Sequence, residues 1–190
     1  LRPSDERMRS FDVLLVDLQD VGLRFYTYYI SMLRMIDACA DFGRSVVILD
    51  RPNPNGMYVD GPVLDMRYKS GVGALPIPVV HGMTLGEIAR MAIGEGWAKR
   101  SDLTVVPVEN YRRSMRYRLP VPPSPNLPTQ HAVLLYPSLC LFEGTVVSLG
   151  RGTDFPFEVY GHPKMTGRDF SFTPEPRDGA KNPPLKGELC

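Results

Sequence analysis

The run Phe11-Asp12-Val13-Leu14-Leu15-Val16-Asp17-Leu18 decides the fold class of this 190-residue chain. Apart from Asp12 it is apolar up to the carboxylate of Asp17, a pattern typical of a parallel strand buried on both faces. The segment Ser45–Asp50 repeats the design as a β-branched run closed by an aspartate. Between the two, apolar residues recur at helical spacing from Thr27 to Gly43, where a glycine favours a helix end. Strand, helix and strand in succession predict a βαβ unit with parallel strands.

A second helix and a third strand are predicted further along. Thr84 and Glu87 have the spacing of a capping box, so we expect a helix from Thr84 to about Trp97. The segment Leu103–Val108 is then a third strand. The order β-α-β-loop-α-β predicts an α/β fold, a Rossmann-like open and mostly parallel sheet with flanking helices.

Proline marks a change of character after Tyr111. The chain holds 19 prolines, about twice the average share, and those at 120–128 exclude a helix or central strand there. Thr145–Leu149 is expected to form a short strand, and residues 150–190 are rich in Gly and Pro and are expected to be irregular. We therefore predict a Rossmann-like domain at 1–130, lacking its N-terminal part, and the truncated start of a smaller C-terminal domain at 131–190.

Composition excludes several classes of function. The formal net charge of +1 provides no broad field for binding nucleic acid. Cys39, Cys140 and Cys190 are odd in number and lack C-x-x-C spacing, which is unlike a disulfide framework or a zinc site. The three histidines have no metal-ligand spacing, so no metal is expected. No apolar run reaches the roughly 18–20 residues of a membrane helix, and no signal peptide is visible.

Polar side chains follow the first two predicted strands, at the sheet edge where ligands bind in open α/β folds. They are Asp17, Gln19, Asp20, Arg24, Tyr26 and Tyr28 after the first strand, and Asp50, Arg51 and Asn53 after the second. Carboxylate, amide and guanidinium groups beside aromatic rings suit a sugar site. In a purely structural alternative, Asp17 and Asp50 cap helix N-termini and pair with Arg24 and Arg51.

Two further places carry candidate side chains. His81 lies at the entrance to the second helix, where the helix N-terminus favours the neutral imidazole for binding substrate; a structural loop histidine is the alternative. The third cluster lies among glycines and consists of Glu143, Arg151, Thr153, Asp154 and Glu158. Arg151 can hold a carboxylate there, either internal or belonging to the substrate, and a structural ion-pair network is the alternative.

Several known nucleotide and hydrolase motifs are missing from the sequence. No G-x-G-x-x-G follows the first strand, where Asp20-Val21-Gly22 stands instead, and no P-loop is present. A nucleotide-binding Rossmann module is therefore a weaker hypothesis. The G-x-S-x-G elbow of the α/β-hydrolases is also absent.

Six ordered motifs resemble those of the exo-β-N-acetylmuramidases, a family long described as a domain of unknown function. The motifs are Asp17–Tyr28, Leu49–Pro54, His81–Thr84, Pro122–Asn126, Glu143–Thr145 and Gly150–Thr153. Their details are most similar to members from Bacteroidetes-type bacteria. The resemblance implies a protein roughly twice this length, with a Rossmann-like N-terminal and a smaller C-terminal domain.

The resemblance also implies an activity and a location. The activity is removal of terminal β-N-acetylmuramic acid from the non-reducing end of peptidoglycan fragments, outside the cytoplasm and without a cofactor. In the family, a Pro-Glu-His-Gly motif upstream of the first motif carries a glutamate regarded as catalytic. Nothing before Asp17 matches that motif, so we expect this chain to be inactive alone.

We therefore predict a metal-independent glycoside hydrolase, which generally needs two carboxyl groups about 5–9 Å apart. Glu143 is the first candidate for catalysis and Asp20 the second. The expected substrate contacts are Asp17, Arg24, Tyr26, Asp50, Arg51, Asn53, His81, Asn126, Arg151, Thr153 and Glu158. The competing hypothesis is a glycan-binding domain without catalysis. The oligomeric state does not follow from the sequence.

Overall fold

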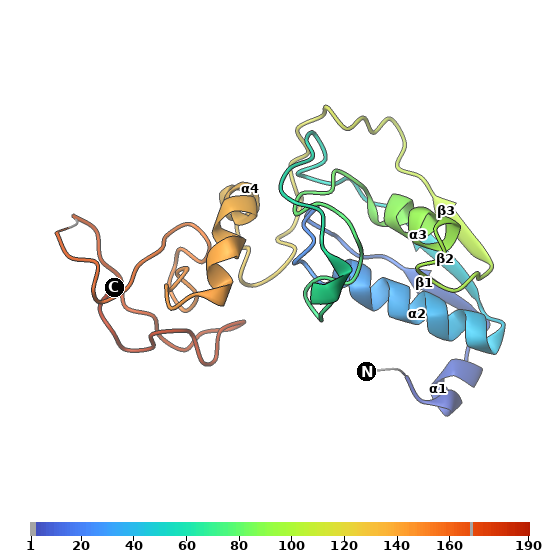
Figure 1. Cartoon of the computed structure of the whole chain (residues 1–190), viewed down its shortest axis with the longest axis horizontal. Helices are drawn as coiled ribbons and strands as arrows, with labels where there is room; N and C mark the ends of the chain where they lie inside the picture. The colour runs from blue at the N-terminus through green and yellow to red at the C-terminus, as the bar shows by residue number, and fades with distance from the viewer. Residues whose placement is uncertain (1–2, 168) are drawn as a thin grey trace. The chain divides into compact units, whose positions relative to one another are not determined.

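The computed structural model describes residues 3–167 and 169–190 (Figure 1). The chain divides into two compact units, Leu1–Tyr117 and Arg118–Cys190. We call them the N-terminal unit and the C-terminal unit and describe each by itself.

The N-terminal unit is built on a three-stranded parallel sheet, as the sequence predicts. The strands β1 (Val13–Val16), β2 (Ser45–Leu49) and β3 (Leu103–Val106) lie in the order β1-β2-β3. Val13 aligns with Ser45, and Val46 aligns with Leu103. Because all three strands run in the same direction, the residues that follow β1 and β2 emerge at the same edge of the sheet.

Helices α2 (Tyr28–Phe42) and α3 (Leu85–Gly94) pack against the sheet and each other (Figure 1). Gly43 ends α2 in the left-handed conformation at φ 60°, as expected of a C-terminal glycine. The predicted capping box of Thr84 and Glu87 is present in α3. This helix ends earlier than predicted, because Gly96 turns the chain at φ 73° and Trp97 donates back to the Ala92 carbonyl.

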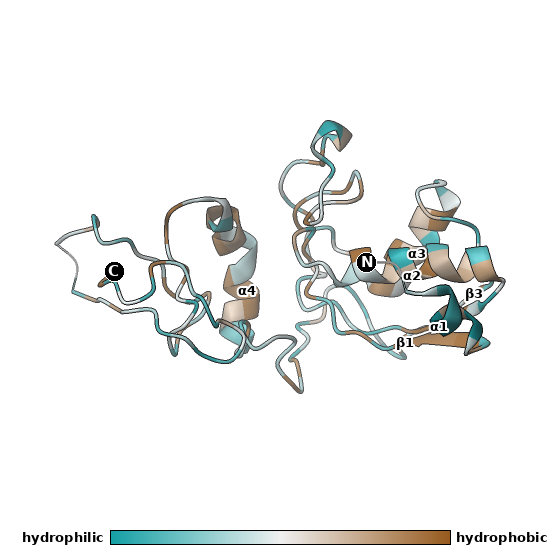
Figure 2. Cartoon of the chain, turned by 90° about the horizontal axis from the view of Figure 1, so that it is seen from below, coloured by the Kyte–Doolittle hydropathy of each residue, from teal (hydrophilic) through white to brown (hydrophobic). Residues whose placement is uncertain are grey.

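The core lies between the sheet and the helices. Val46, Ile48, Ile36 and Ile88 are among its most buried members. A short helix that the sequence analysis missed, α1 (Asp5–Arg9), contributes Met8. On the opposite face of the sheet, Val13 and Leu15 are 52% and 60% exposed, and Figure 2 shows β1 as an apolar strand. The helices α2 and α3 therefore cover one face only, and the predicted burial of the first strand on both faces is wrong, because the described residues leave the other face of β1 exposed.

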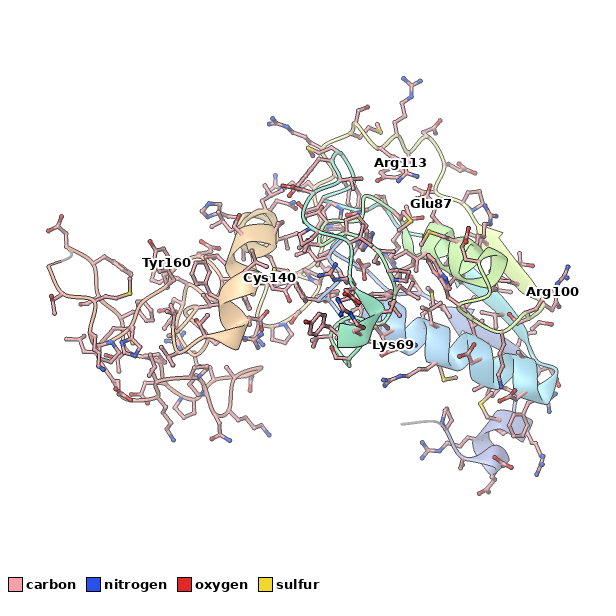
Figure 3. The ribbon with its side chains drawn as sticks, viewed as in Figure 1. Lys69, Glu87, Arg100, Arg113, Cys140 and Tyr160 are labelled. Carbon is pink, nitrogen blue, oxygen red and sulfur yellow. The ribbon has the colours of Figure 1, made fainter. Side chains whose placement is uncertain are left out.

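The loops of the N-terminal unit are ordered by specific contacts. The connection between β2 and α3 holds a 3-10 turn, η1 (Met66–Tyr68). In the loop after β3, Arg113 donates to Oε1 of Glu87 at 2.6 Å and also to the Gly82 carbonyl. Arg113 and Glu87 are labelled in Figure 3. The contact ties that loop to the first turn of α3.

The C-terminal unit contains α4 (Gln130–Leu139) and the 3-10 helix η2 (Cys140–Gly144). The proline-rich stretch at 120–128 forms neither helix nor strand, as predicted. The predicted strand at Thr145–Leu149 is wrong. The Thr145 hydroxyl donates to the Phe142 carbonyl and accepts from the Val147 amide, so the chain turns there. Only one isolated bridge, between Ser148 and Gly161, remains.

Two of the cysteines are buried, and the helices are short. Cys39 and Cys140 are buried free thiols, as small apolar residues would be. Within the described ranges, none of the helices has the length and apolar character needed to cross a membrane.

Candidate functional site

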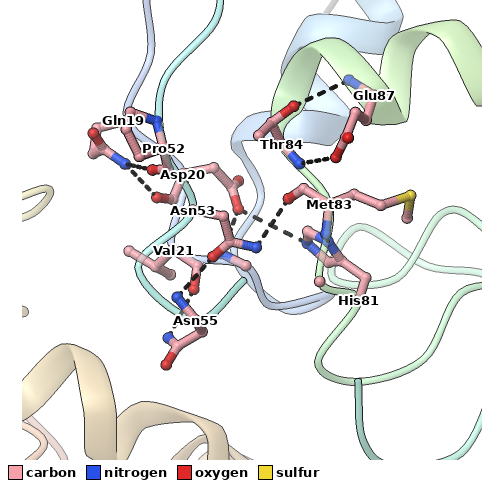
Figure 4. Close-up of polar contacts among 12 residues, drawn as sticks. Gln19, Asp20, Val21, Pro52, Asn53, Asn55, His81, Met83, Thr84 and Glu87 are labelled. Carbon is pink, nitrogen blue, oxygen red and sulfur yellow. Dashed lines mark hydrogen bonds and ion pairs between the residues drawn. The ribbon is translucent and has the colours of Figure 1, made fainter. Parts of the chain in front are cut away.

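Three segments meet at the carboxyl edge of the sheet: the loops after β1 and β2 and the approach to α3 (Figure 4). Asn53 donates from Nδ2 to the Met83 carbonyl at 2.9 Å, and its Oδ1 accepts the Asn55 amide. Asn55 in turn donates to the Val21 carbonyl at 2.9 Å. Both asparagines are buried, so their side chains hold the segments together rather than face solvent.

Gly22 lets the first two of these segments approach closely. Its φ is 82°, and a Cβ placed there would lie 2.2 Å from Oδ1 of Asn53. Glycine is therefore required both by the backbone conformation and by the packing. The contact fixes the turn that presents Asp20.

Asp20 is a buried carboxyl group within this cluster, 5% exposed. Its Oδ1 accepts the Gly22 amide at 2.7 Å, whereas Oδ2 has no hydrogen-bond partner among the described residues. Burial raises the pKa of Asp20 to about 7, and the amides of Gly22 and Val21 only partly offset that effect. The side chain can therefore carry a proton near neutral pH.

His81 faces Asp20 and is fully buried (Figure 4). Its Nδ1 accepts the Met83 amide at 3.2 Å, which assigns the hydrogen of the neutral ring to Nε2. Nε2 lies 3.8 Å from Oδ1 of Asp20 and has no hydrogen-bond partner in the part of the chain described. Burial lowers the pKa of His81 to about 4, so the ring is neutral, as expected, although burial is the cause.

Asp50 and Asp17 have structural partners. Asp50 accepts the Thr84 hydroxyl at 2.5 Å and the Gly86 amide at 3.0 Å, and so anchors the start of α3 to the end of β2. Asp17 pairs with Arg51 at 2.5 Å, and this hydrogen bond lowers the pKa of Asp17. The structural alternative therefore describes Asp50 well, and Arg51 is the partner of Asp17.

Arg24 and Tyr26 are both buried. Arg24 donates from one guanidinium nitrogen to the carbonyls of Pro62 and Ile77, each at 2.7 Å. It thus supports the long loop before α3. The ring of Tyr26 packs on that of Tyr28 with centroids 4.6 Å apart.

In the C-terminal unit, Glu143 and Arg151 form an ion pair at 2.7 Å. The side chain of Glu143 is 33% exposed, and the Arg151 guanidinium lies 4.8 Å from the centre of the Phe157 ring. The pKa of Tyr136 is raised by burial and, second, by Glu143. The ion pair thus packs against the Phe157 ring on one side and is accessible to solvent on the other.

The remaining candidates of this unit hold its loops. Glu158 accepts from the Thr129 hydroxyl and lies 3.2 Å from Nδ1 of His131, at the start of α4. Asn126 donates to the Gly179 carbonyl at 2.9 Å, and the Thr153 hydroxyl donates to the Gly150 carbonyl at 2.7 Å.

Two clefts contain residues that the sequence analysis missed. A cleft of about 310 Å³ in the C-terminal unit includes Asn126 and Thr153, together with Arg177 and Asp178 from the irregular segment. The turn dipeptide Asp178-Gly179 was the available signal. A smaller cleft of about 140 Å³ in the N-terminal unit is lined by Asp50, Thr84, Gly86, Glu87, Arg90, Val105, Pro107, Val108 and Tyr111. Among the residues described, no group of three His, Cys, Asp or Glu side chains is placed to hold a metal.

The chain is similar to proteins of known sequence and structure. It is 44% identical over 167 residues to the peptidoglycan beta-N-acetylmuramidase NamZ of Bacillus subtilis, covering 85% of this chain and 40% of the relative. A crystal structure of a DUF1343 family protein from Bacteroides fragilis matches with a TM-score of 0.96 at 65% identity, covering all of this chain and 55% of the other. A second B. fragilis DUF1343 structure matches with a TM-score of 0.86 at 28% identity, covering 99% of this chain and 54% of the other.

The family models divide the chain in two. The model described as exo-beta-N-acetylmuramidase NamZ, N-terminal, matches residues 1–131, and its C-terminal counterpart matches residues 134–190. The chain spans about half the length of the relatives it matches. With both models matched in order, the chain belongs to the exo-beta-N-acetylmuramidase NamZ family.

Proposed function

We propose that the protein carrying this chain is an exo-β-N-acetylmuramidase. It releases terminal β-N-acetylmuramic acid from the non-reducing end of peptidoglycan fragments, using carboxylate acid/base chemistry without a metal. Family membership and the name of the B. subtilis relative support this proposal. The activity is proposed for the longer protein, because this chain spans 40% of that relative.

The observation that carries the proposal is the state of Asp20. A glycosidase needs an acid that is protonated near neutral pH to donate to the leaving oxygen. Asp20 has a pKa raised to about 7 and an Oδ2 without a hydrogen-bond partner among the described residues. Oδ2 is buried in this structure, so the acid role requires that the glycosidic oxygen, or one water between the two atoms, reach Oδ2 when substrate is bound.

Glu143 is the second carboxylate of the proposal. It is partly exposed, and Arg151 fixes its orientation at 2.7 Å. Arg151 also offers guanidinium donors that suit the lactyl carboxylate of muramic acid, because guanidinium groups bind carboxylates with two parallel hydrogen bonds. Glu143 would then orient the substrate through Arg151.

The decisive experiment measures release of N-acetylmuramic acid from a disaccharide ending in that sugar, using the full-length protein. We expect release to continue in excess chelator and to decline as the pH rises through about 7, where Asp20 loses its proton. Asp20→Asn and Glu143→Gln should each lower kcat at least a hundredfold while the protein stays folded. Asp169→Asn, an exposed carboxylate, serves as the control.

Three outcomes separate the hypotheses. Saccharide binding without release in the wild type would favour the glycan-binding alternative. Full activity in Asp20→Asn would remove Asp20 from the mechanism, and chelator sensitivity would refute metal independence.

A substrate in the cell wall also leads us to propose that the protein works outside the cytoplasm. Fractionation of cells producing the full-length protein would check this location.

A further inference from the structure

The larger cleft is lined only by residues of the C-terminal unit. Its walls come from three segments: Pro125–Pro128, Gly152–Pro156 and Arg177–Asp178. Its volume of about 310 Å³ is at the lower end of the roughly 300–1,000 Å³ range of small-molecule sites. The size suits a single sugar ring rather than a longer ligand.

Two glycines set the walls close together. A Cβ at Gly152 would lie 2.4 Å from the Glu175 carbonyl oxygen, and a Cβ at Gly179 would lie 2.7 Å from the Pro125 side chain. The Glu175 amide donates to the Gly152 carbonyl at 2.9 Å, so these segments are also hydrogen-bonded. The cleft is therefore fixed by backbone packing and not only by flexible side chains.

The charges of the cleft are unevenly balanced. Asp154 forms an ion pair with Arg177, which lowers the pKa of Asp154. Asp178 is exposed, and the described residues provide it with no ion-pair partner. Among the described residues that line the cleft, two carboxylates thus accompany one guanidinium, and this excess of negative charge disfavours an anionic ligand.

The remaining walls suit a sugar that is uncharged. Carboxylates accept hydrogen bonds from hydroxyl groups. Pro125, Pro128 and Pro156 add apolar surface that can pack on the C–H face of a pyranose ring. Hydroxyl-binding groups and apolar faces occur together here. Among the described lining residues, the two carboxylates outnumber the guanidinium that would favour a ligand with a carboxylate of its own.

We propose that this cleft binds a neutral hexosamine residue of the saccharide chain, with Asp178 and Asp154 accepting its hydroxyl hydrogens. The acidic muramic acid residue is discriminated against by the same two carboxylates. The proposal rests on the proposed function for its choice of a saccharide ligand. It assigns Asp178 to specificity, a role that the sequence motifs do not give to this residue.

The test is direct binding to the full-length protein, measured by ligand-observed NMR and calorimetry with N-acetylglucosamine and N-acetylmuramic acid as probes. We expect the neutral sugar to bind, and Asp178→Ala to weaken that binding at least fivefold. Asp169→Ala, an exposed aspartate outside the cleft, is the matched control and should bind as the wild type does. Asp154→Asn gives a second variant if Asp178→Ala fails to fold.

The result is independent of turnover. Unchanged binding in both cleft variants, or preference for muramic acid that survives Asp178→Ala, would overturn the proposal. If the neutral sugar binds in the cleft but wild-type protein releases no muramic acid, the proposed activity fails while the cleft assignment stands. If release occurs without any cleft-dependent binding, the reverse holds.

Discussion

At the scale of single residues, Asp20 and His81 are a buried pair whose pKa values are shifted in opposite directions. Burial favours the neutral form of each, raising the pKa of Asp20 to about 7 and lowering that of His81 to about 4. Burial raises the pKa of the neighbouring Tyr29; the charge of Arg24 lowers it and that of Asp20 raises it by smaller amounts. The pair therefore affects stability in two opposing ways as the pH changes.

The first prediction concerns the pH dependence of stability. The folded state binds the Asp20 proton more tightly than the unfolded state, so its contribution is present below about pH 4 and is lost as the pH rises towards 7. His81 contributes above pH 6.5 and loses its contribution as the pH falls to about 4. The two slopes largely cancel in the wild type between pH 4 and 6.5.

Single substitutions should reveal each slope. In Asp20→Asn the free energy of unfolding should rise with pH across this window, because only the His81 contribution remains. In His81→Gln it should fall with pH. Urea titrations at pH 4, 5, 6 and 7 provide the measurement. Parallel pH profiles for the wild type and both variants would contradict the assigned pKa shifts.

The second prediction separates backbone strain from packing at two glycines. Gly22 has φ 82° and would place a Cβ 2.2 Å from Asn53, whereas Gly43 has φ 60° and open space around it. Gly43→Ala should cost about 1 kcal/mol of unfolding free energy, from the left-handed backbone alone. Gly22→Ala should cost clearly more, because Asn53 must also move. Equal losses in urea unfolding would show that the Asn53 contact is soft.

At the scale of elements, the two main helices begin differently, although both have threonine at the N-cap. Thr84 accepts the Glu87 amide and donates to Asp50, whereas Thr27 makes no capping hydrogen bond with its side chain. We expect Thr84→Ala to lower the unfolding free energy by about 1–2 kcal/mol and Thr27→Ala to have little effect. Chemical denaturation of the two variants tests this, and similar losses would argue against the cap as the cause.

At the scale of the whole molecule, the chain spans 55% of the B. fragilis protein with which it shares 65% identity. We therefore predict that residues 1–190 alone release no N-acetylmuramic acid, whereas the full-length protein does. Assaying both under identical conditions tests this. Comparable rates would mean that the carboxylates of this chain suffice.

Much of the fold follows from local patterns. The apolar runs and the glycine at position 43 predict the positions of β1, β2 and α2, because these depend on neighbours within one element. The predicted burial of β1 on both faces is wrong, because burial depends on what packs on the sheet, and Val13 and Leu15 are exposed. The strand predicted at Thr145–Leu149 is wrong because a strand needs a partner, and the described residues supply only one bridge there. The sequence pattern also indicates which sheet edge carries the polar residues.

The sequence by itself determined the α/β class, the main elements of the N-terminal unit and, through its ordered motifs, the family. Only the tertiary structure decided what each polar residue does. Asp50 anchors the start of α3 because the fold brings it to Thr84, which lies 34 positions further along the chain. Asp20 faces His81 across a separation of 61 positions, and this second pair is sealed from water. Burial and charge partners depend on such distant contacts, and they, rather than residue type, set the pKa of a carboxyl group.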